Sequence, residues 1–290
     1  MFQWKGKYYQ FTCLPNVLSF APRIITKILK PVYARLCSIG HTCMGHIDDS
    51  LLVGQSFDSC HRNIADTVCL FTNLGFTIHP VKSVLQPQQK IDFLGFVLDS
   101  STMTVTLTGA KAMNVRSACQ NLLLQKTATI HSVAQVIGFL DSSFPAVEFA
   151  EMHYRHLELD NICALRAKKG NFDCIMTLSA QSKIELTWWI DNVLTASKPI
   201  SHGNPDLTLT TDASNLGWGA VCGDTSTGGF WSLEEQGNHI NFLELKVVLL
   251  GLKSRCGAFS EKHILLQSDN TTAVACINAM RCIKSIPWQS

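Results

Sequence analysis

The chain has 290 residues, of which 46% are hydrophobic and 16% are charged, and a formal net charge of +2. The length allows more than one domain, and the composition excludes a disordered tail, a collagen-like repeat and a coiled coil. Lysine or arginine interrupts the longest apolar stretches, so we expect no transmembrane helix and no membrane partner. The near-neutral charge neither requires nor excludes nucleic acid, because binding depends on where basic side chains cluster.

Cysteine is frequent, with twelve in the chain. The N-terminus MFQWKGKYYQF has no apolar signal segment and no cleavage site, so we expect reduced thiols in the cytoplasm or nucleus. Cys37, His41, Cys43 and His46 lie close together in the sequence, which raises the question of zinc. Their spacing contains no Cys-x2-Cys pair and fits no common zinc module, so we do not predict a zinc site.

The first half of the chain alternates helical and strand-like patterns. Apolar side chains recur at helical spacing over residues 19–36, which predicts a buried helix bent at Pro31. Two short apolar runs flank Asp48 and Asp49 and predict a hairpin with the acidic pair at its tip. The later patterns predict a helix ended by Gly75, strands at Ile91–Leu98 and Met103–Leu107, and helices at Ala110–Leu124, Ile130–Leu140 and Ser179–Leu194.

A domain boundary is expected at Ser197–Pro205, and the pattern changes beyond it. The predicted elements are strands at Leu207–Thr211, Trp218–Cys222 and Phe230–Trp231, a helix at Asn241–Leu252, a strand at His263–Ser268 and a helix at Thr271–Met280. The predicted order is therefore β-β-β-α-β-α.

Two sets of acidic residues could carry chemistry. Adjacent strand residues point to opposite faces, so Asp48 and Asp49 can share a metal only where a tight turn redirects them. Asp212 and Asp269 follow strands, and Glu244 lies on a helix between them, so all three converge if those strands pair in parallel. Simple structural roles are the alternatives: an acidic turn for the first pair, and an Asx-turn and a helix cap for Asp212 and Asp269.

Several segments resemble motifs of reverse transcriptases. LPNVLSFAPR (residues 14–23) is similar to the LPxGLSSAPR element, HIDD (46–49) to the Tyr-x-Asp-Asp box, Lys82 to the lysine of a following motif, and FLGF (93–96) to the primer grip. TDAS (211–214), NFLEL (241–245) and SDNTTA (268–273) resemble three of the four acidic motifs of a type 1 ribonuclease H. In this order the motifs resemble the polymerase–ribonuclease H region of a DIRS-type, tyrosine-recombinase retrotransposon.

The resemblance implies an α+β fold with three parts. These are a reverse-transcriptase palm fragment (residues 1–108), a helical thumb and connection (109–200) and a partial α/β ribonuclease H-like domain (205–290). The implied activity is RNA-directed DNA synthesis with removal of the RNA strand of RNA–DNA hybrids, using Mg²⁺ or Mn²⁺ in two-metal sites. The implied partners are RNA template, DNA primer, hybrid and deoxynucleoside triphosphates, while the oligomeric state stays open.

The resemblance also assigns roles to particular residues. Asp48 and Asp49 would hold the polymerase metal ions, and Lys82 would contact the triphosphate or its leaving group. Metal ions acting on the hybrid would be held by Asp212, Glu244 and Asp269. The residues implied to contact primer or template are Pro15, Asn16, Ser19, Phe93, Leu94, Gly95 and Phe96.

The sequence departs from the family pattern in ways that bear on activity. The strand with the first palm aspartate is expected before Met1, and the fourth ribonuclease H carboxylate beyond Ser290. Val17, Phe20 and His46 stand where the family has glycine, serine and tyrosine. We therefore expect the chain by itself to be inactive, and the alternative function is a non-catalytic, nucleic-acid-binding relic of a retroelement polymerase.

Overall fold

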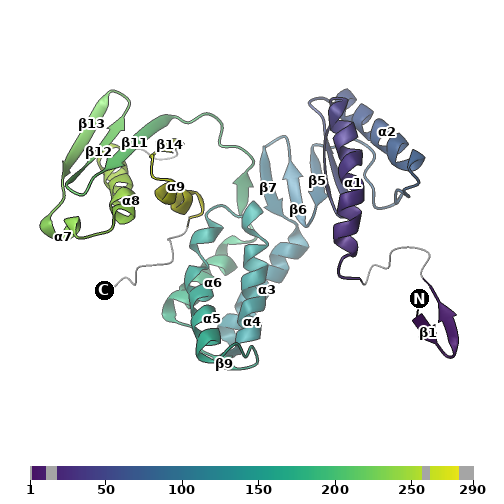
Figure 1. Ribbon diagram of the computed structural model, residues 1–290, viewed down its shortest axis with the longest axis horizontal. Coiled ribbons are helices and arrows are strands. Elements are labelled where there is room, and N and C mark those ends of the chain that lie inside the picture. Colours follow the sequence, from purple (N-terminus) through teal and green to yellow (C-terminus); the bar gives the residue numbers. More distant parts are fainter. Residues whose placement is uncertain (1, 11–17, 257–261, 281–290) are drawn as a thin grey trace. The chain divides into compact units, whose positions relative to one another are not determined.

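The computed structural model describes residues 2–10, 18–256 and 262–280 (Figure 1). It divides into two compact units, Met1–Ser101 and Thr102–Ser290. Within the described ranges, no helix is both long and apolar enough to cross a membrane.

The first unit contains three hairpins and two long helices. Its first six elements are β1 (Phe2–Trp4), β2 (Lys7–Tyr9), α1 (Ala21–Ser38), β3 (Thr42–His46), β4 (Asp49–Val53) and α2 (Phe57–Asn73), and the third hairpin follows them. The predicted hairpin around the acidic pair is confirmed, because β3 and β4 pair antiparallel. The buried core of this unit lies between α1 and α2 and is formed by Leu29, Val32, Leu36 and Phe71.

The helix α2 is bound to the open end of the β3–β4 hairpin. Ser56 and Ser59 form a capping box that satisfies the first backbone N–H groups of the helix. The fully buried Asn63 side chain donates from Nδ2 to the carbonyl oxygens of Thr42 (2.9 Å) and Val53 (3.1 Å), one from each strand. A buried amide with both partners supplied fixes the helix against the hairpin.

The segment Ile91–Leu98, predicted as one strand, is a hairpin, so that prediction is wrong. It forms β5 (Lys90–Phe93) and β6 (Phe96–Asp99), which pair antiparallel. Leu94 and Gly95 between them both have positive φ, 53° and 79°. Two consecutive positive φ values are the geometry of a type I′ hairpin turn, which the β-forming character of the flanking residues concealed.

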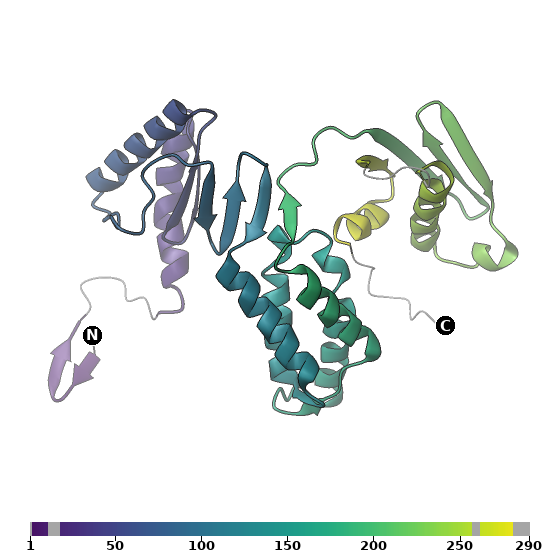
Figure 2. The same cartoon turned by 180° about the vertical axis from the view of Figure 1, so that it is seen from behind.

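A four-helix bundle opens the second unit. Its elements are β7 (Thr104–Leu107), α3 (Gly109–Leu124), β8 (Ala128–Thr129), α4 (Ile130–Asp141), η1 (Phe144–Ala146), η2 (Ala150–Met152), α5 (Arg155–Ala167), β9 (Ile175–Met176), α6 (Ala180–Asn192) and β10 (Ser197–Pro199). The four α-helices run side by side in both views (Figures 1 and 2). The sequence patterns did not predict α5. The strand β10 lies in the segment expected to be a domain boundary, and it pairs with β7.

The C-terminal part is a mixed four-stranded sheet with helices. Its elements are β11 (Leu207–Ala213), β12 (Gly217–Cys222), β13 (Thr225–Phe230), α7 (Leu233–Gln236), α8 (Ile240–Gly251), the π-helical turn η3 (Leu252–Cys256), β14 (Ile264–Gln267) and α9 (Thr271–Asn278). The strand order is β13-β12-β11-β14. The predicted order of strands and helices is confirmed apart from the short helix α7, which was not predicted. The third strand was expected at Phe230–Trp231 and lies instead at Thr225–Phe230.

The helix α8 packs tightly on β11 and β12. Its buried Leu243 and Val247 join Ala213 and Trp231 in one apolar cluster. At its end, a Cβ on Gly251 would lie only 3.0 Å from the Cβ of Ala220. Glycine therefore allows the end of α8 to approach the sheet, and this packing sets the position of the side chains that α8 carries.

Candidate functional site

The sheet brings two of the predicted acidic residues to equivalent positions on neighbouring strands. β11 and β14 pair in parallel, with Thr210 opposite Gln267, as the convergence of the acidic residues requires. Asp212 lies two residues beyond Thr210, and Asp269 lies two residues beyond Gln267. Parallel neighbours are about 4.8 Å apart, so the two carboxylates share one edge of the sheet.

Glu244 of α8 completes a group of three carboxylates with Asp212 and Asp269. One ligand atom from each lies within 4.8 Å of the others. Asp212 and Asp269 are exposed, whereas Glu244 is only 3% exposed. Within the part of the chain that the structure describes, no other group of three or more potential ligands lies this close together. The convergence predicted from the sequence is confirmed, while a metal-binding role stays a prediction.

The buried Glu244 carboxylate is held by two donors from the strand ends. Its Oε1 accepts from the backbone N–H of Ala213 at 3.4 Å, and its Oε2 accepts from Ser268 Oγ at 3.5 Å. Both distances are at the long end of the hydrogen-bond range. The two donors therefore orient the carboxylate but stabilise its negative charge only weakly. Ala213 and Ser268 both lie within the acidic motifs quoted from the sequence, but the sequence alone did not assign either of them a contact with Glu244.

The electrostatics of the group favour a cation. Burial raises the pKa of Glu244 above its ordinary value of 4.5, and the charges of Asp212 and Asp269 raise it further, against the opposing hydrogen bonds from Ala213 and Ser268. A charged carboxylate is therefore costly in this position without a counterion. The donor set consists of carboxylate oxygens alone, which fits the hard cations Mg²⁺ and Mn²⁺.

Other residues serve the turns and caps that the acidic residues were alternatively expected to provide. Asn270, not Asp269, caps α9, since its Oδ1 accepts from the Ala273 N–H at 2.9 Å. Asn270 Nδ2 also donates to Asn241 Oδ1 at 3.0 Å, which links the starts of α9 and α8. In the turn after β11, Ser214 Oγ accepts from the Gly217 N–H at 3.1 Å. Helix capping therefore does not account for Asp269.

The other acidic set, the pair Asp48 and Asp49, lies at the tip of the β3–β4 hairpin. His46 pairs with Asp49 across a two-residue turn formed by Ile47 and Asp48. Ile47 has a positive φ of 55°, which is unfavourable for a β-branched residue. Asp48 and Asp49 are both exposed. Among the described residues they belong to no cluster of three potential metal ligands, so the structure does not bring them together with a further carboxylate.

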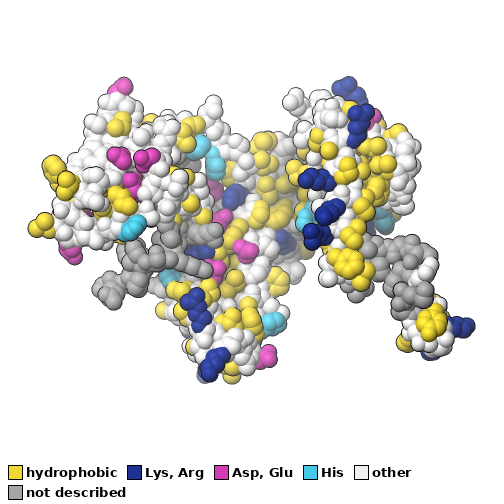
Figure 3. Space-filling view, in the orientation of Figure 1, with side chains coloured by type: hydrophobic (Ala, Val, Ile, Leu, Met, Phe, Trp, Pro, Cys, Tyr) yellow, Lys and Arg dark blue, Asp and Glu magenta, His cyan; other side chains and the backbone are white. Residues whose placement is uncertain are grey.

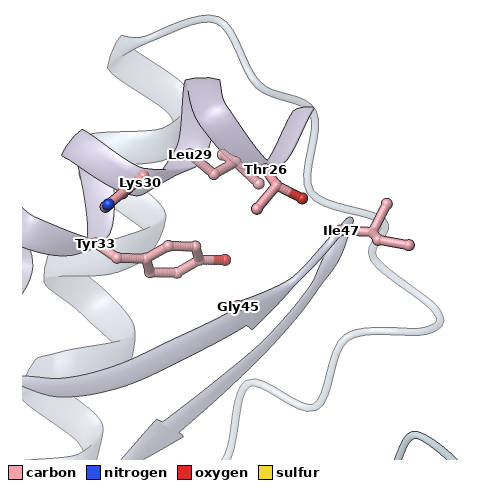
Figure 4. A pocket seen from close by; sticks show the side chains of 6 residues that line it. All are labelled: Thr26, Leu29, Lys30, Tyr33, Gly45 and Ile47. Carbon is pink, nitrogen blue, oxygen red and sulfur yellow. The ribbon is translucent and has the colours of Figure 1, made fainter. Parts of the chain in front are cut away.

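Contacts from α1 support this hairpin from one side. The Tyr33 ring lies over Gly45 of β3 (Figure 4). The Tyr33 hydroxyl hydrogen-bonds to Ser50 Oγ of β4 at 2.5 Å. A pocket of about 170 Å³ lies beside the Tyr33 ring and is lined by Thr26, Leu29, Lys30, Tyr33, Gly45 and Ile47. The position of the acidic turn therefore depends on how α1 packs against β3.

We expect Gly45→Ala to destabilise the first unit. A Cβ at this position would overlap the Tyr33 ring, so the ring must move away from its hydrogen bond with Ser50, which costs about 1 kcal/mol of unfolding free energy. Urea denaturation followed by circular dichroism measures the loss. Gly138→Ala is the control, because open space surrounds that helical position and alanine there is neutral or stabilising. Equal stability of Gly45→Ala and the parent chain would contradict the packing described here.

The remaining predicted site residues lie on turns or outside the described part. Lys82 is exposed in a turn, where its backbone N–H donates to His79 Nδ1 at 3.3 Å. No ion pair between described residues joins Lys82 to Asp48 or Asp49. Ser19 is exposed just before α1. Phe93, Leu94, Gly95 and Phe96 form the tip of the β5–β6 hairpin, and Pro15 and Asn16 lie outside the described residues.

Comparison with known proteins supplies a fold but no sequence family. No family model matches the chain, and no curated protein matches its sequence. The structure of the foamy viral protease-reverse transcriptase in complex with dsDNA is similar, with a TM-score of 0.55 and 14% identity over 95% of this chain and 56% of the other. Its complex with an RNA/DNA hybrid has a TM-score of 0.52 and 14% identity over 99% and 41% of the two chains.

A third structure, the dRH form of the same foamy viral protein with dsDNA, has a TM-score of 0.50 and 13% identity over 92% and 49% of the two chains. The chain thus spans about half the length of the solved structures that it matches. Its helices and strands have a reverse-transcriptase-like fold.

Proposed function

We propose that the chain is the polymerase–ribonuclease H region of a reverse transcriptase, of the DIRS-type retrotransposon class that its motifs resemble. The single observation that carries the proposal is the convergence of Asp212, Glu244 and Asp269 at the edge of the β11–β14 pair. The similar solved structures hold dsDNA or an RNA/DNA hybrid, which supports nucleic acid as the partner. The proposed domains are palm (1–108), thumb and connection (109–200) and ribonuclease H (205–290).

In the proposed ribonuclease site, Asp212, Glu244 and Asp269 hold Mg²⁺ or Mn²⁺. A divalent ion there would activate water and stabilise the charge that develops on phosphate as the RNA strand is cut. The Ala213 N–H and the Ser268 hydroxyl orient the Glu244 carboxylate toward the two aspartates. The packing of Gly251 against the sheet keeps α8, and with it Glu244, in position.

In the proposed palm, the acidic turn and nearby basic residues face the substrates. Asp48 and Asp49 are the proposed metal ligands, Lys82 the triphosphate contact, and the tip of the β5–β6 hairpin the primer contact. Figure 3 shows lysine and arginine side chains gathered along α1. Arg23, Lys27 and Lys30 are exposed and spaced to share one face of that helix, a pattern suited to phosphate contacts.

We expect Asp212→Asn to lower whatever residual cleavage of a labelled RNA–DNA hybrid the chain supports by at least about 100-fold, because a proposed metal ligand is lost. The assay uses the full chain with Mn²⁺ and compares rates under single-turnover conditions. Asp224→Asn is the matched control, since it removes the same charge from an exposed turn of the same sheet. If cleavage by Asp212→Asn equals that by the parent, or if hybrid is cleaved equally with a chelator present, the proposed site is wrong.

Duplex binding without DNA synthesis is the second candidate, and the Asp48–Asp49 turn favours it. These carboxylates lack a third nearby ligand among the described residues, and palm catalysis depends on a complete metal cluster. Primer extension on an RNA template separates the two functions. Extension abolished by Asp48→Asn supports the polymerase, whereas salt-dependent duplex binding without extension supports the binding protein.

A further inference from the structure

Two thiols meet where α1 packs against β3. Cys37 in the last turn of α1 and Cys43 in β3 have their Sγ atoms 3.7 Å apart. The sequence had grouped these cysteines with His41 and His46 as a conceivable zinc set. In the structure His41 Nε2 instead pairs with Asp66 Oδ2 of α2 at 2.7 Å, and no zinc-type cluster forms among the described residues. What remains of the group is a pair of facing thiols.

The periodicities of the two elements explain this meeting. Tyr33 and Cys37 are four residues apart and share one face of α1, while Cys43 and Gly45 are two apart and share one face of β3. Tyr33 covers Gly45, which places Cys37 over Cys43. The Cys43 thiol also donates a hydrogen bond to the Tyr33 carbonyl oxygen, with 3.8 Å between Sγ and the oxygen. The thiol pair therefore belongs to the same contact that supports the acidic turn.

The two thiols differ in reactivity. Cys37 is exposed, so a solvent-borne reagent reaches it first. Cys43 is half-buried, and burial, followed by the neighbouring Cys37 thiol, raises its pKa to about 11. Since the thiolate is the nucleophile in disulfide chemistry, Cys43 is the slower of the two. Once Cys37 has reacted and no longer carries a thiol, its contribution to the raised pKa of Cys43 is removed.

We propose that Cys37 and Cys43 form a reversible disulfide site, oxidised by low-molecular-weight disulfides of the glutathione class. The Cys37 thiolate attacks one sulfur of the small disulfide, whose S–S bond breaks and releases one small thiol. Cys43 then loses its proton and attacks Cys37 Sγ, which releases the second small thiol. Two protein thiols are oxidised to one disulfide while one small disulfide is reduced to two thiols.

Little movement is needed for the bond to form. The two Sγ atoms must approach from 3.7 Å to about 2.05 Å, which rotation about the side-chain torsions can supply in part. The bond would join the end of α1 to β3 near the open end of the β3–β4 hairpin, three residues before His46. Oxidation therefore fixes α1 against the hairpin and should slow amide hydrogen exchange in β3.

The test uses the full chain, reduced and then equilibrated with glutathione redox buffers. Free thiols are alkylated, and peptides are mapped by mass spectrometry. We expect a cross-linked species containing Cys37 and Cys43, lighter by two hydrogen atoms and reversed by dithiothreitol. If both cysteines stay alkylated while other thiols oxidise, or if they carry only separate glutathione adducts, the proposal is wrong.

Variants test the order of the two steps. Cys43→Ser should accumulate glutathione on Cys37, since the resolving thiol is absent. In Cys37→Ser, Cys43 should be modified at least about tenfold more slowly than Cys37 is in Cys43→Ser. Cys163→Ser, which removes an exposed thiol of α5, should oxidise like the parent. Equal modification rates at Cys37 and Cys43 in the single variants would overturn the proposed order. Mapping of the parent chain decides the disulfide itself even if a variant fails to fold.

Discussion

Trp189→Ala is expected to lower the unfolding free energy of the helical bundle by about 3–5 kcal/mol. Trp189 of α6 is completely buried and stacks on Phe144, with ring centroids 6.5 Å apart. Its indole N–H donates to the His153 carbonyl oxygen at 2.8 Å. Truncation removes the largest buried side chain of the bundle and leaves that carbonyl without its donor, so a cavity and an unsatisfied polar group arise together.

Two matched variants separate these contributions. Trp189→Phe keeps most of the ring and loses the N–H, so we expect a loss of about 1 kcal/mol. Ile184→Ala on the same helix removes a side chain that is 61% exposed, and its effect should stay within about 0.5 kcal/mol. Urea denaturation by far-ultraviolet circular dichroism gives all three values. A Trp189→Ala chain as stable as Ile184→Ala would show that α6 does not pack as described.

The sequence predicted the order of elements in the C-terminal sheet well because its signals are local and agree with one another. The strand β11 alternates buried and exposed side chains at its end, where Asp212 lies, and Asp269 lies two residues beyond the end of β14. Once those strands are taken as parallel neighbours, the edge that the two aspartates share follows from sheet geometry. Convergence of the acidic residues could therefore be predicted without coordinates.

The missed helix α5 shows where local signals fail. Its N-cap residue, Tyr154, makes no side-chain cap, and the backbone N–H groups of His156 and Leu157 donate instead to the buried carboxylate of Glu185 on α6. A buried asparagine, Asn161, occupies an interior position and donates to the Ile130 carbonyl oxygen at 2.9 Å. Both devices depend on residues far away in the sequence, so neither leaves a pattern near α5.

The acidic hairpin shows a different limit. The turn itself was predicted from Asp48 and Asp49, yet its support by Tyr33 over Gly45 depends on the angle at which α1 meets β3. Periodicity indicates which residues share a face of one element, but it does not indicate which face of another element they will meet. The same holds for Cys37 and Cys43, whose proximity follows from that packing.

Glu244→Gln is expected to change stability in opposite directions without and with metal. In the metal-free chain the raised pKa of Glu244 means that the folded state keeps a proton that the unfolded state loses above its ordinary value of 4.5. The favourable contribution present below that pH is therefore lost as pH rises through the raised pKa. Glutamine cannot ionise, so at neutral pH the variant should be more stable than the parent, by on the order of 1 kcal/mol.

A carboxylate of the short helix α7 provides a control for the sign of this pH dependence. Hydrogen bonds from Lys246 and Ser232 lower the pKa of Glu235 to about 2. Its contribution to stability is present above the ordinary value of 4.5 and is lost as pH falls toward the lowered pKa. Glu235→Gln should therefore destabilise the neutral chain, and the two glutamine variants should differ from the parent in opposite directions.

Adding Mn²⁺ should reverse the order of Glu244→Gln and the parent. A ligand at 100 times its dissociation constant stabilises the folded state by about 2.7 kcal/mol, and the parent should gain this while the variant, with a weakened site, gains less. Thermal melts across pH, with and without Mn²⁺, measure both effects. A variant that melts below the parent without metal would mean that the hydrogen bonds from Ala213 and Ser268 outweigh the cost of burying the charge. Equal stabilisation of both chains by Mn²⁺ would mean that Glu244 contributes nothing to metal binding, and the buried carboxylate would then need another explanation.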